Sequence, residues 1–287
     1  MAETALIFGA SGFIGSYLYR ALSKTRFHVT GTYHSRPAPG LTQLDLLDTQ
    51  ALRRLLQQEQ PGLVLFLAGT KDVKRCEQEP QYAIDINVQV VQNYLEACHE
   101  TGQTPATLFF STDYVFPGTH GHYQSADAVG PRTVYGVTNL LSERLLLASK
   151  LPGMILRVSA VMGREGGFFQ WLEQSLSEDK PLSLFANTYF SPTSIGRLCD
   201  FVTEYSNRST RELSAGMHLK HISDGYRFSR HEFGCAVAKR LGKPTSLLQA
   251  TEADLSATTF QADLSLLPDG LEKFRDPSDW DELEKMG

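Results

Sequence analysis

The sequence predicts an α/β protein: a doubly wound parallel sheet with a smaller C-terminal lobe. Short, continuous apolar runs of the kind found in buried parallel strands recur up to residue 158. Segments with the apolar spacing of amphipathic helices separate these runs. The glycine-rich stretch 9–15 (GASGFIG) lies between the first predicted strand and the first predicted helix. Strands and helices that alternate in this way are typical of successive βαβ units in one parallel sheet.

The stretch 9–15 predicts a dinucleotide-binding turn, because the apolar run 5–8 (ALIF) precedes it as a strand and a helix follows. We expect Gly9 to allow the tight turn, Gly12 to let a pyrophosphate approach the backbone, and Gly15 to permit close helix packing. The free amides at the helix N-terminus would then bind the anion. An ordinary tight turn is the plainer alternative. The cofactor-binding candidates in this segment are Gly9, Ser11, Gly12, Phe13, Ile14 and Gly15.

Composition excludes several classes of protein. The 287 residues include 41% hydrophobic and 21% charged residues, which is ordinary for a globular chain. A net charge of -5 offers no general attraction to nucleic acid or to an anionic membrane, so neither is an expected partner. The four cysteines show no C-x-x-C spacing, so we expect neither a metal site nor a disulfide framework. The sequence shows no apolar run long enough to span a membrane and no basic signal region. We therefore expect a cytoplasmic location.

The second predicted strand, 28–33, is followed by a turn that favours NADP(H). Its residues are His34, Ser35 and Arg36, and no carboxylate is present. Sites that prefer NAD usually place Asp or Glu here to bind the ribose 2′-hydroxyl, whereas a nearby arginine accommodates a 2′-phosphate. We therefore take the three residues as cofactor-binding candidates and expect NADP(H), with NAD(H) as the alternative. The plainer interpretation of Arg36 is a solvated turn arginine.

Three further predicted strands, 41–44, 63–67 and 108–110, bring candidate residues to one edge of the sheet. Ligands bind outside the carboxyl ends of the strands in sheets of this kind. The residues that follow the first two of these strands are further cofactor-binding candidates, namely Asp45, Leu46, Ala68, Gly69 and Thr70. Ser111 and Thr112, which follow the third, are catalytic candidates.

Two long helices are predicted beside these strands. The first covers about 80–100, and its inner face is expected to carry Ile84 and Asn87. A buried asparagine needs hydrogen-bond partners, so we expect Asn87 to tie this helix to a neighbouring strand rather than to act in catalysis. The second helix begins near Thr133 and contains the sequence YGVTN at 135–139.

Four segments together resemble the extended short-chain dehydrogenase/reductase family. The branch that they resemble most is dTDP-4-dehydrorhamnose reductase, with its relative, the regulatory beta subunit of methionine adenosyltransferase. The resemblance extends to about residue 240 and is weak beyond it. The segments are GASGFIG at 9–15, STDYVFPG at 111–118, YGVTN followed by LLSER at 135–144, and SPTSIGRLCDFV at 191–202.

The resemblance implies roles for particular residues. In this family the threonine of STDYVF helps to polarise the substrate carbonyl, which points to Thr112 or its neighbour Ser111. The tyrosine of a Y-x-x-x-K motif donates the proton and matches Tyr135. The aspartate of the LDL segment, here Asp45, contacts the adenine amino group. Each residue also has a plainer interpretation, as a strand-end hydroxyl, a packed aromatic side chain or a turn cap.

The chain departs from the family pattern at Asn139, where the family has lysine. Asn139 keeps the i, i+4 spacing from Tyr135 and stays a candidate catalytic residue on the same helix face. An asparagine can bind a ribose hydroxyl but carries no charge to stabilise a phenolate. A unit charge at about 5 Å, with an effective dielectric of about 20, contributes roughly 3 kcal/mol. Lys71 and Lys74 are the nearest replacement cations in the sequence, although solvated loop lysines are the plainer interpretation.

The missing charge affects the two directions of reaction differently. Oxidation of an alcohol needs the phenolate as a base, whereas reduction of a carbonyl needs the neutral phenol as an acid. Reduction therefore survives the substitution better. The leading hypothesis is an NADP(H)-dependent oxidoreductase that reduces a carbonyl, most naturally on a nucleotide-linked 4-keto deoxy sugar. The alternative is a catalytically impaired, cofactor-binding regulatory protein. The sequence does not fix the substrate or the oligomeric state, and a homodimer is one alternative.

Two parts of the chain are expected to form separate domains. Residues 1–163 and 190–224 would form the dinucleotide-binding (Rossmann) domain, and residues 164–189 and 225–287 the substrate-binding lobe. The resemblance implies that this lobe holds the nucleotide part of a substrate. However, the tail lacks the arginine-bearing segment expected there. The remaining candidates for phosphate recognition are Lys220, Arg227 and Arg230.

Overall fold

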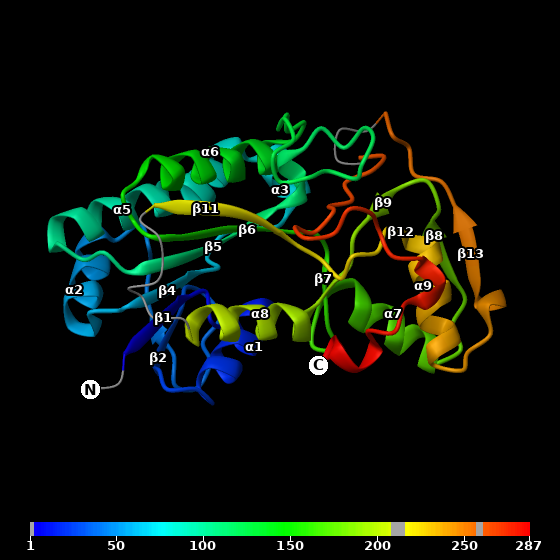
Figure 1. Cartoon of the computed structure of the whole chain (residues 1–287), viewed down its shortest axis with the longest axis horizontal. Helices are drawn as coiled ribbons and strands as arrows, with labels where there is room; N and C mark the ends of the chain where they lie inside the picture. The colour runs from blue at the N-terminus through cyan, green and yellow to red at the C-terminus, as the bar shows by residue number, and fades with distance from the viewer. Residues whose placement is uncertain (1–2, 208–215, 257–260) are drawn as a thin grey trace. The chain divides into compact units, whose positions relative to one another are not determined.

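The computed structural model describes residues 3–207, 216–256 and 261–287, and it separates into two compact units (Figure 1). Unit 1 comprises the described parts of 1–111, 134–156 and 199–219. Unit 2 comprises the described parts of 112–133, 157–198 and 220–287.

Unit 1 is built on a seven-stranded parallel sheet with the strand order β11-β6-β5-β4-β1-β2-β3. The chain starts in the middle of the sheet and extends it first to one side and then to the other, which confirms the predicted doubly wound fold. The strands are β1 (Thr4–Phe8), β2 (His28–Tyr33), β3 (Thr42–Gln43), β4 (Leu63–Phe66), β5 (Ala106–Thr112), β6 (Gly153–Val158) and β11 (Met217–Ile222); the last residues of β5, β6 and β11 belong to unit 2.

Helices cover both faces of this sheet. Helix α1 (Phe13–Leu22) lies on one face, and α5 (Val90–Thr101) and α6 (Val134–Ala148) lie on the other (Figure 1). Helix α2 (Thr49–Glu59) packs against α5, and α3 (Val73–Gln78) packs against α6. Strands β1 and β4 are almost wholly buried between these layers, which explains their continuous apolar sequences.

The helix predicted over 80–100 is interrupted. Helix α4 (Pro80–Ile84) passes into a π-helical turn at Asp85–Gln89, and α5 then begins at Val90. A π turn holds more residues than an α turn, so it rotates the residues before it around the axis relative to those after it. The prediction that Ile84 faces inward is therefore wrong, and its side chain is 40% exposed.

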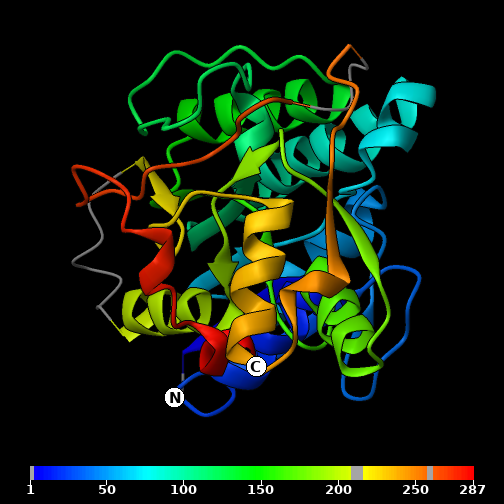
Figure 2. The ribbon, with the colours of Figure 1, turned by 90° about the vertical axis from the view of Figure 1, so that its right-hand side faces the viewer.

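Unit 2 consists of short strand pairs and helices around a core of its own. Helix α9 packs against α7 and against strands β8, β12 and β13 (Figure 2). The sequence SRHE at 229–232 predicts a capping box. The structure confirms it, because the Ser229 hydroxyl and the Glu232 carboxylate each accept from the other's backbone N–H at the start of α9. The strand pairs are β7 (Val161–Met162) with β10 (Thr193–Ser194), β9 (Tyr189–Phe190) with β12 (Phe228–Ser229), and β8 (Leu182–Phe185) with β13 (Leu248–Thr251); the helices are α7 (Gly167–Ser177), α9 (Arg230–Arg240) and the first turn of α8 (Ile195–Asn207).

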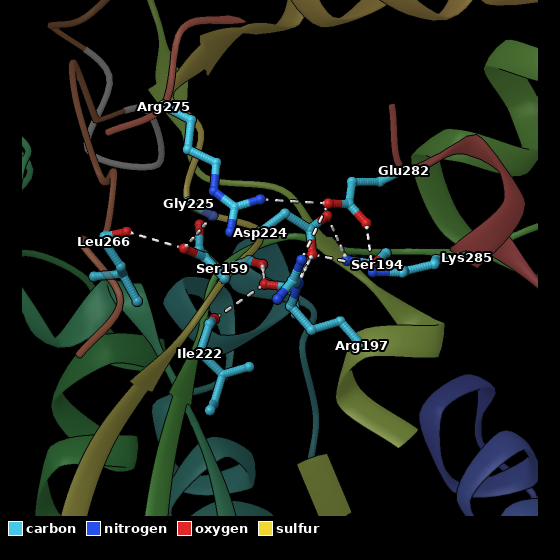
Figure 3. A network of polar contacts seen from close by, with 12 residues as sticks. Ser159, Ser194, Arg197, Ile222, Asp224, Gly225, Leu266, Arg275, Glu282 and Lys285 are labelled. Atoms are coloured by element: carbon cyan, nitrogen blue, oxygen red, sulfur yellow. Dashed lines mark hydrogen bonds and ion pairs between the residues drawn. The ribbon is translucent and has the colours of Figure 1, made fainter. Parts of the chain in front are cut away.

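A buried charge network ties the C-terminal segment to the rest of unit 2 (Figure 3). Asp224 accepts hydrogen bonds of 2.9 Å from the backbone N–H and the hydroxyl of Ser194 and from Nε of Arg197. Arg197 also donates to Glu282 at 3.0 Å, and Nζ of Lys285 lies 3.1 Å from the same carboxylate. Burial raises the pKa of Asp224 to about 6, although Ser194 and Arg197 favour its ionised form.

Candidate functional site

The glycine turn between β1 and α1 leaves the helix N-terminus open. Gly9 has a φ of +83°, and a Cβ there would lie 3.1 Å from the backbone of Leu67 and Ala68. A Cβ on Gly15 would lie 2.2 Å from the carbonyl oxygen of Gly9, so both positions require glycine for the turn itself. A Cβ on Gly12 would meet only that oxygen, at 3.2 Å. No side chain caps α1 and no acidic residue lies in its first turn, so its amides can receive an anion.

The end of β2 is exposed and carries His34, Ser35 and Arg36. A carboxylate does reach this edge, because β3 pairs with β2 and brings Oδ2 of Asp45 to 3.9 Å from Nε2 of His34. The sequence places no carboxylate on β2 itself, and only the strand pairing brings one from the neighbouring strand. Any preference for a 2′-phosphate therefore depends on Arg36. The side chain of Leu46, which follows Asp45, is buried in the core of unit 1.

Asn87 lies in the π-helical turn and connects three segments of unit 1. Its Oδ1 accepts from the backbone N–H of Thr70 at 2.9 Å, and its Nδ2 donates to the hydroxyl of Thr138 at 3.0 Å. Its carbonyl oxygen accepts from the Ser142 hydroxyl at 2.6 Å. Asn87 does tie its helix to other segments, but these are the turn after β4 and helix α6, not a strand as expected.

Helix α6 carries Tyr135 and Asn139. The Tyr135 side chain is half-buried, and Asn139 is 8% exposed. Nδ2 of Asn139 donates to the backbone carbonyl oxygen of Tyr135 at 2.8 Å, so the amide turns back onto its own helix. Lys71 and Lys74, the replacement cations considered from sequence, are both exposed.

A buried carboxylate on α6 that the sequence analysis did not single out contacts one of the catalytic candidates. Ser111 donates its hydroxyl to Oε1 of Glu143 at 2.5 Å, and both side chains are buried. Glu143 follows Asn139 by four residues and Tyr135 by eight, so all three share one face of α6. This spacing is the signal that could have identified Glu143. Because the Ser111 proton is directed at a carboxylate, Ser111 can offer a ligand only its lone pairs.

Thr112, the first residue of unit 2, is paired with a different carboxylate. Its hydroxyl donates to Oδ1 of Asp113 at 2.9 Å and accepts from the backbone N–H of Tyr114. The hydroxyl of Ser159 donates to Oδ2 of Asp113 at 2.5 Å. Burial raises the pKa of Asp113 to about 6, although Ser159, Thr112 and the charge of Arg230 oppose the shift. The ionised carboxylate of Asp113 therefore accepts a hydrogen bond from the Thr112 hydroxyl. Protonation of Asp113 weakens this hydrogen bond and makes the hydroxyl proton of Thr112 available to a ligand.

The candidate residues are divided between the two units. The cofactor-binding candidates all lie in unit 1, together with Ser111, Tyr135 and Asn139, and Thr112 lies in unit 2 with Lys220, Arg227 and Arg230. Among the described residues, no group of His, Cys, Asp or Glu side chains is arranged to hold a metal ion. The described helices include none with the length and apolar character needed to cross a bilayer.

A doubly wound parallel sheet with a glycine turn after its first strand defines the Rossmann class of dinucleotide-binding folds. Within this class, the chain belongs to the family described as RmlD substrate binding domain, whose model matches residues 3–263.

Named relatives of this chain fall into two functional groups. Methionine adenosyltransferase 2 subunit beta of Xenopus tropicalis is 28% identical over 88% of this chain and 77% of its own length. dTDP-4-dehydrorhamnose reductase of Salmonella typhimurium is also 28% identical, over 88% and 83%. The structure of dTDP-4-dehydrorhamnose reductase from Bacillus anthracis in complex with NADP has a TM-score of 0.83 at 19% identity and covers 100% of this chain and 99% of that one. Other solved proteins with this fold contain NAD.

Proposed function

We propose that this protein is an NADP(H)-dependent reductase that converts a carbonyl group to an alcohol. The observation that carries the proposal is the glycine turn after β1, where Gly12 leaves the backbone accessible and the N-terminus of α1 is uncapped by any side chain. Such a site suits the pyrophosphate of a dinucleotide. The cofactor, when bound, supplies the hydride for the carbonyl carbon.

The residues of this chain would supply the proton and the polarisation. Tyr135 donates its phenolic proton to the carbonyl oxygen, so that hydride addition at carbon yields a neutral alcohol. Thr112 is the candidate for polarising a substrate carbonyl, when its hydroxyl proton is not held by Asp113. Ser111 is less suited to this task because its proton is directed at Glu143. Asn139 contributes no charge, which favours reduction over alcohol oxidation.

The proposed substrate is a nucleotide-linked 4-keto deoxy sugar. The support is membership of the RmlD substrate binding domain family and the similarity to the Salmonella reductase. The proposed domains are those expected from the sequence, with residues 164–189 and 225–287 as the lobe that binds the sugar nucleotide.

A regulatory, non-catalytic function is the second candidate. It is favoured by the hydrogen bond that ties Asn139 to its own helix, and by the similarity to methionine adenosyltransferase 2 subunit beta. Under this alternative the protein still binds a dinucleotide, but Tyr135 transfers no proton.

The test is NADPH oxidation by the purified protein with a panel of 4-keto nucleotide sugars, with product analysis by mass spectrometry. We expect one or more members of the panel to gain two hydrogen atoms for each NADPH consumed. If NADPH binds but no member of the panel is reduced, the reductase proposal fails for this substrate class and the regulatory alternative is preferred.

A further inference from the structure

Arg230, the first residue of α9, places its guanidinium group against two aromatic rings of unit 2. The guanidinium carbon lies 4.6 Å from the ring centre of Phe168, in α7, and 4.2 Å from that of Phe190, in β9. Cations are attracted to both ring faces, so the stack fixes the position of the group. It does not satisfy the N–H donors of the guanidinium.

One end of this guanidinium has no partner. Its Nη1 atom is buried and makes no hydrogen bond. Among the described residues, no carboxylate lies within ion-pair distance of Arg230. Burial lowers the pKa of Arg230, and the nearby groups of Tyr114 and Asp113 only partly oppose this effect. The two oxygens of Asp113 are already engaged by Thr112 and Ser159.

Arg227, three residues earlier, shows the contrasting arrangement. Its Nε and Nη2 atoms each lie 2.7 Å from Oδ2 of Asp263, and its guanidinium stacks on Tyr189 at 3.6 Å. Arg227 is therefore committed to a contact within the protein. Of the two arginines considered from sequence as phosphate-binding candidates, Arg230 has a buried nitrogen without a hydrogen-bond partner, whereas no buried nitrogen of Arg227 lacks one.

A buried cation without a counter-charge destabilises the folded protein unless a ligand supplies that charge. We propose that Arg230 binds a negatively charged oxygen group of the substrate, either the diphosphate of a sugar nucleotide or a carboxylate on the sugar. This inference rests on the proposed function, because Asp113 and Tyr114, the polar neighbours of Arg230, directly follow Thr112 in the chain. The anion would thus bind in unit 2 near the residue assigned to the carbonyl.

The first test needs neither turnover nor a known substrate. Arg230→Met replaces the cation by a flexible apolar side chain beside the same two rings, and Arg227→Met is the matched control. Without ligand, we expect Arg230→Met to keep or raise the unfolding temperature, because it removes an unpaired buried charge. Arg227→Met should lower that temperature, because it leaves Asp263 buried and unpaired.

The second arm measures anion binding in the same three proteins. Unfolding temperatures are measured in inorganic phosphate and in chloride at equal ionic strength. The increase caused by phosphate should be larger for wild type, and for any folded Arg227→Met protein, than for Arg230→Met. Calorimetry with UDP-glucose and UDP-glucuronic acid then locates the anion. An affinity loss of about tenfold to a hundredfold in Arg230→Met for both ligands assigns the diphosphate, and a loss for UDP-glucuronic acid alone assigns the carboxylate.

Two results would overturn the inference. One is a fall in unfolding temperature for Arg230→Met as large as that for Arg227→Met, which would make Arg230 a structural residue. The other is equal affinity of wild type and Arg230→Met for phosphate and for both sugar nucleotides, including no detectable binding by either. Failure of the reductase proposal is distinguishable, because it would appear as absent NADPH oxidation while the anion-binding difference remained.

Discussion

The side-chain amide of Asn139 donates a hydrogen bond of 2.8 Å to the backbone carbonyl oxygen of Tyr135, one helical turn earlier in α6. This contact holds an uncharged group at the position where the resemblance to short-chain reductases implies a lysine. Tyr135 therefore has no cation from that position of its own helix to stabilise a phenolate. A reaction that uses the neutral phenol as an acid tolerates this arrangement better than one that uses the phenolate as a base.

Arg36 should determine the cofactor preference. We expect wild type to bind NADPH more tightly than NADH, and Arg36→Ala to lose most of this difference, about tenfold or more, because a charge-assisted contact to the 2′-phosphate disappears. Calorimetric titration of both cofactors measures the effect. Arg54→Ala, at an exposed arginine of α2 that is not a cofactor-binding candidate, serves as the control. Equal affinities in wild type, or an unchanged preference in Arg36→Ala, would refute the assignment.

The glycines of the turn should separate cofactor binding from folding. Gly12→Val places a branched side chain where the pyrophosphate is expected, so NADPH affinity should fall by well over about tenfold while the protein still folds. Gly15→Val should instead lower the unfolding temperature, because its Cβ would lie 2.2 Å from the carbonyl oxygen of Gly9. Normal NADPH binding by a folded Gly12→Val protein would show that the glycine is needed only for the turn.

Asp113 should make reduction dependent on pH. The pKa of Asp113 is raised to about 6, so its carboxyl group loses its proton as the pH rises through that value. The ionised form accepts a hydrogen bond from the Thr112 hydroxyl, so this hydroxyl no longer donates to the substrate carbonyl. The kcat/KM for carbonyl reduction should therefore fall above about pH 6. Asp113→Asn can donate to the Thr112 oxygen at every pH, so its profile should be flat over this range. A decline of the same size in Asp113→Asn would contradict the assignment.

Arg197 should matter for stability and not for cofactor binding. Arg197→Met leaves the buried carboxylates of Asp224 and Glu282 without their main counter-charge, and we expect a loss of about 3 kcal/mol in the free energy of unfolding at neutral pH. This loss is at the low end of the range for breaking a buried ion pair, because the Arg197 side chain is partly exposed. The control, Arg164→Met, breaks an exposed pair with Glu173 and should cost about 1 kcal/mol or less.

The pH dependence of this stability loss follows from Asp224. Its folded pKa is raised to about 6 from 3.8, so both the folded and the unfolded chain hold the proton at sufficiently low pH. Without a charge on Asp224, Arg197 stabilises less. Removal of the Arg197 charge raises the pKa of Asp224 further, so the variant takes up the proton first. The difference between wild type and Arg197→Met in urea denaturation should therefore shrink as the pH falls towards about 6. A difference that grows on acidification would contradict this account of the network.

The sequence predicted the parts of the fold that depend on local patterns. Apolar runs such as β1, the glycine turn and the Ser229–Glu232 capping box are all local, and each is present. The π-helical turn at Asp85–Gln89 could not be predicted from helical spacing, because it depends on Asn87 reaching Thr70 and Thr138 from other segments. For this reason the orientation of Ile84 was predicted incorrectly.

The candidate site divides in the same way. Motif residues such as Gly12 and Tyr135 could be named from sequence, whereas the contacts that limit Ser111 and Thr112 depend on which carboxylate lies beside each hydroxyl. The carboxylate beside Ser111 is Glu143, 32 residues later in the chain. The different situations of Arg227 and Arg230 likewise follow from tertiary contacts with Asp263, Phe168 and Phe190.

The central claim is that Tyr135 donates the proton in a carbonyl reduction, and one measurement tests it most directly. NADPH oxidation is followed with 4-keto nucleotide sugars for wild type, Tyr135→Phe and Asn139→Lys, after equal NADPH affinity has been verified. We predict turnover in wild type, its loss in Tyr135→Phe, and equal or higher turnover in Asn139→Lys, since the restored charge stabilises the developing phenolate by at most roughly 3 kcal/mol. Wild-type turnover that persists in Tyr135→Phe would contradict the claim.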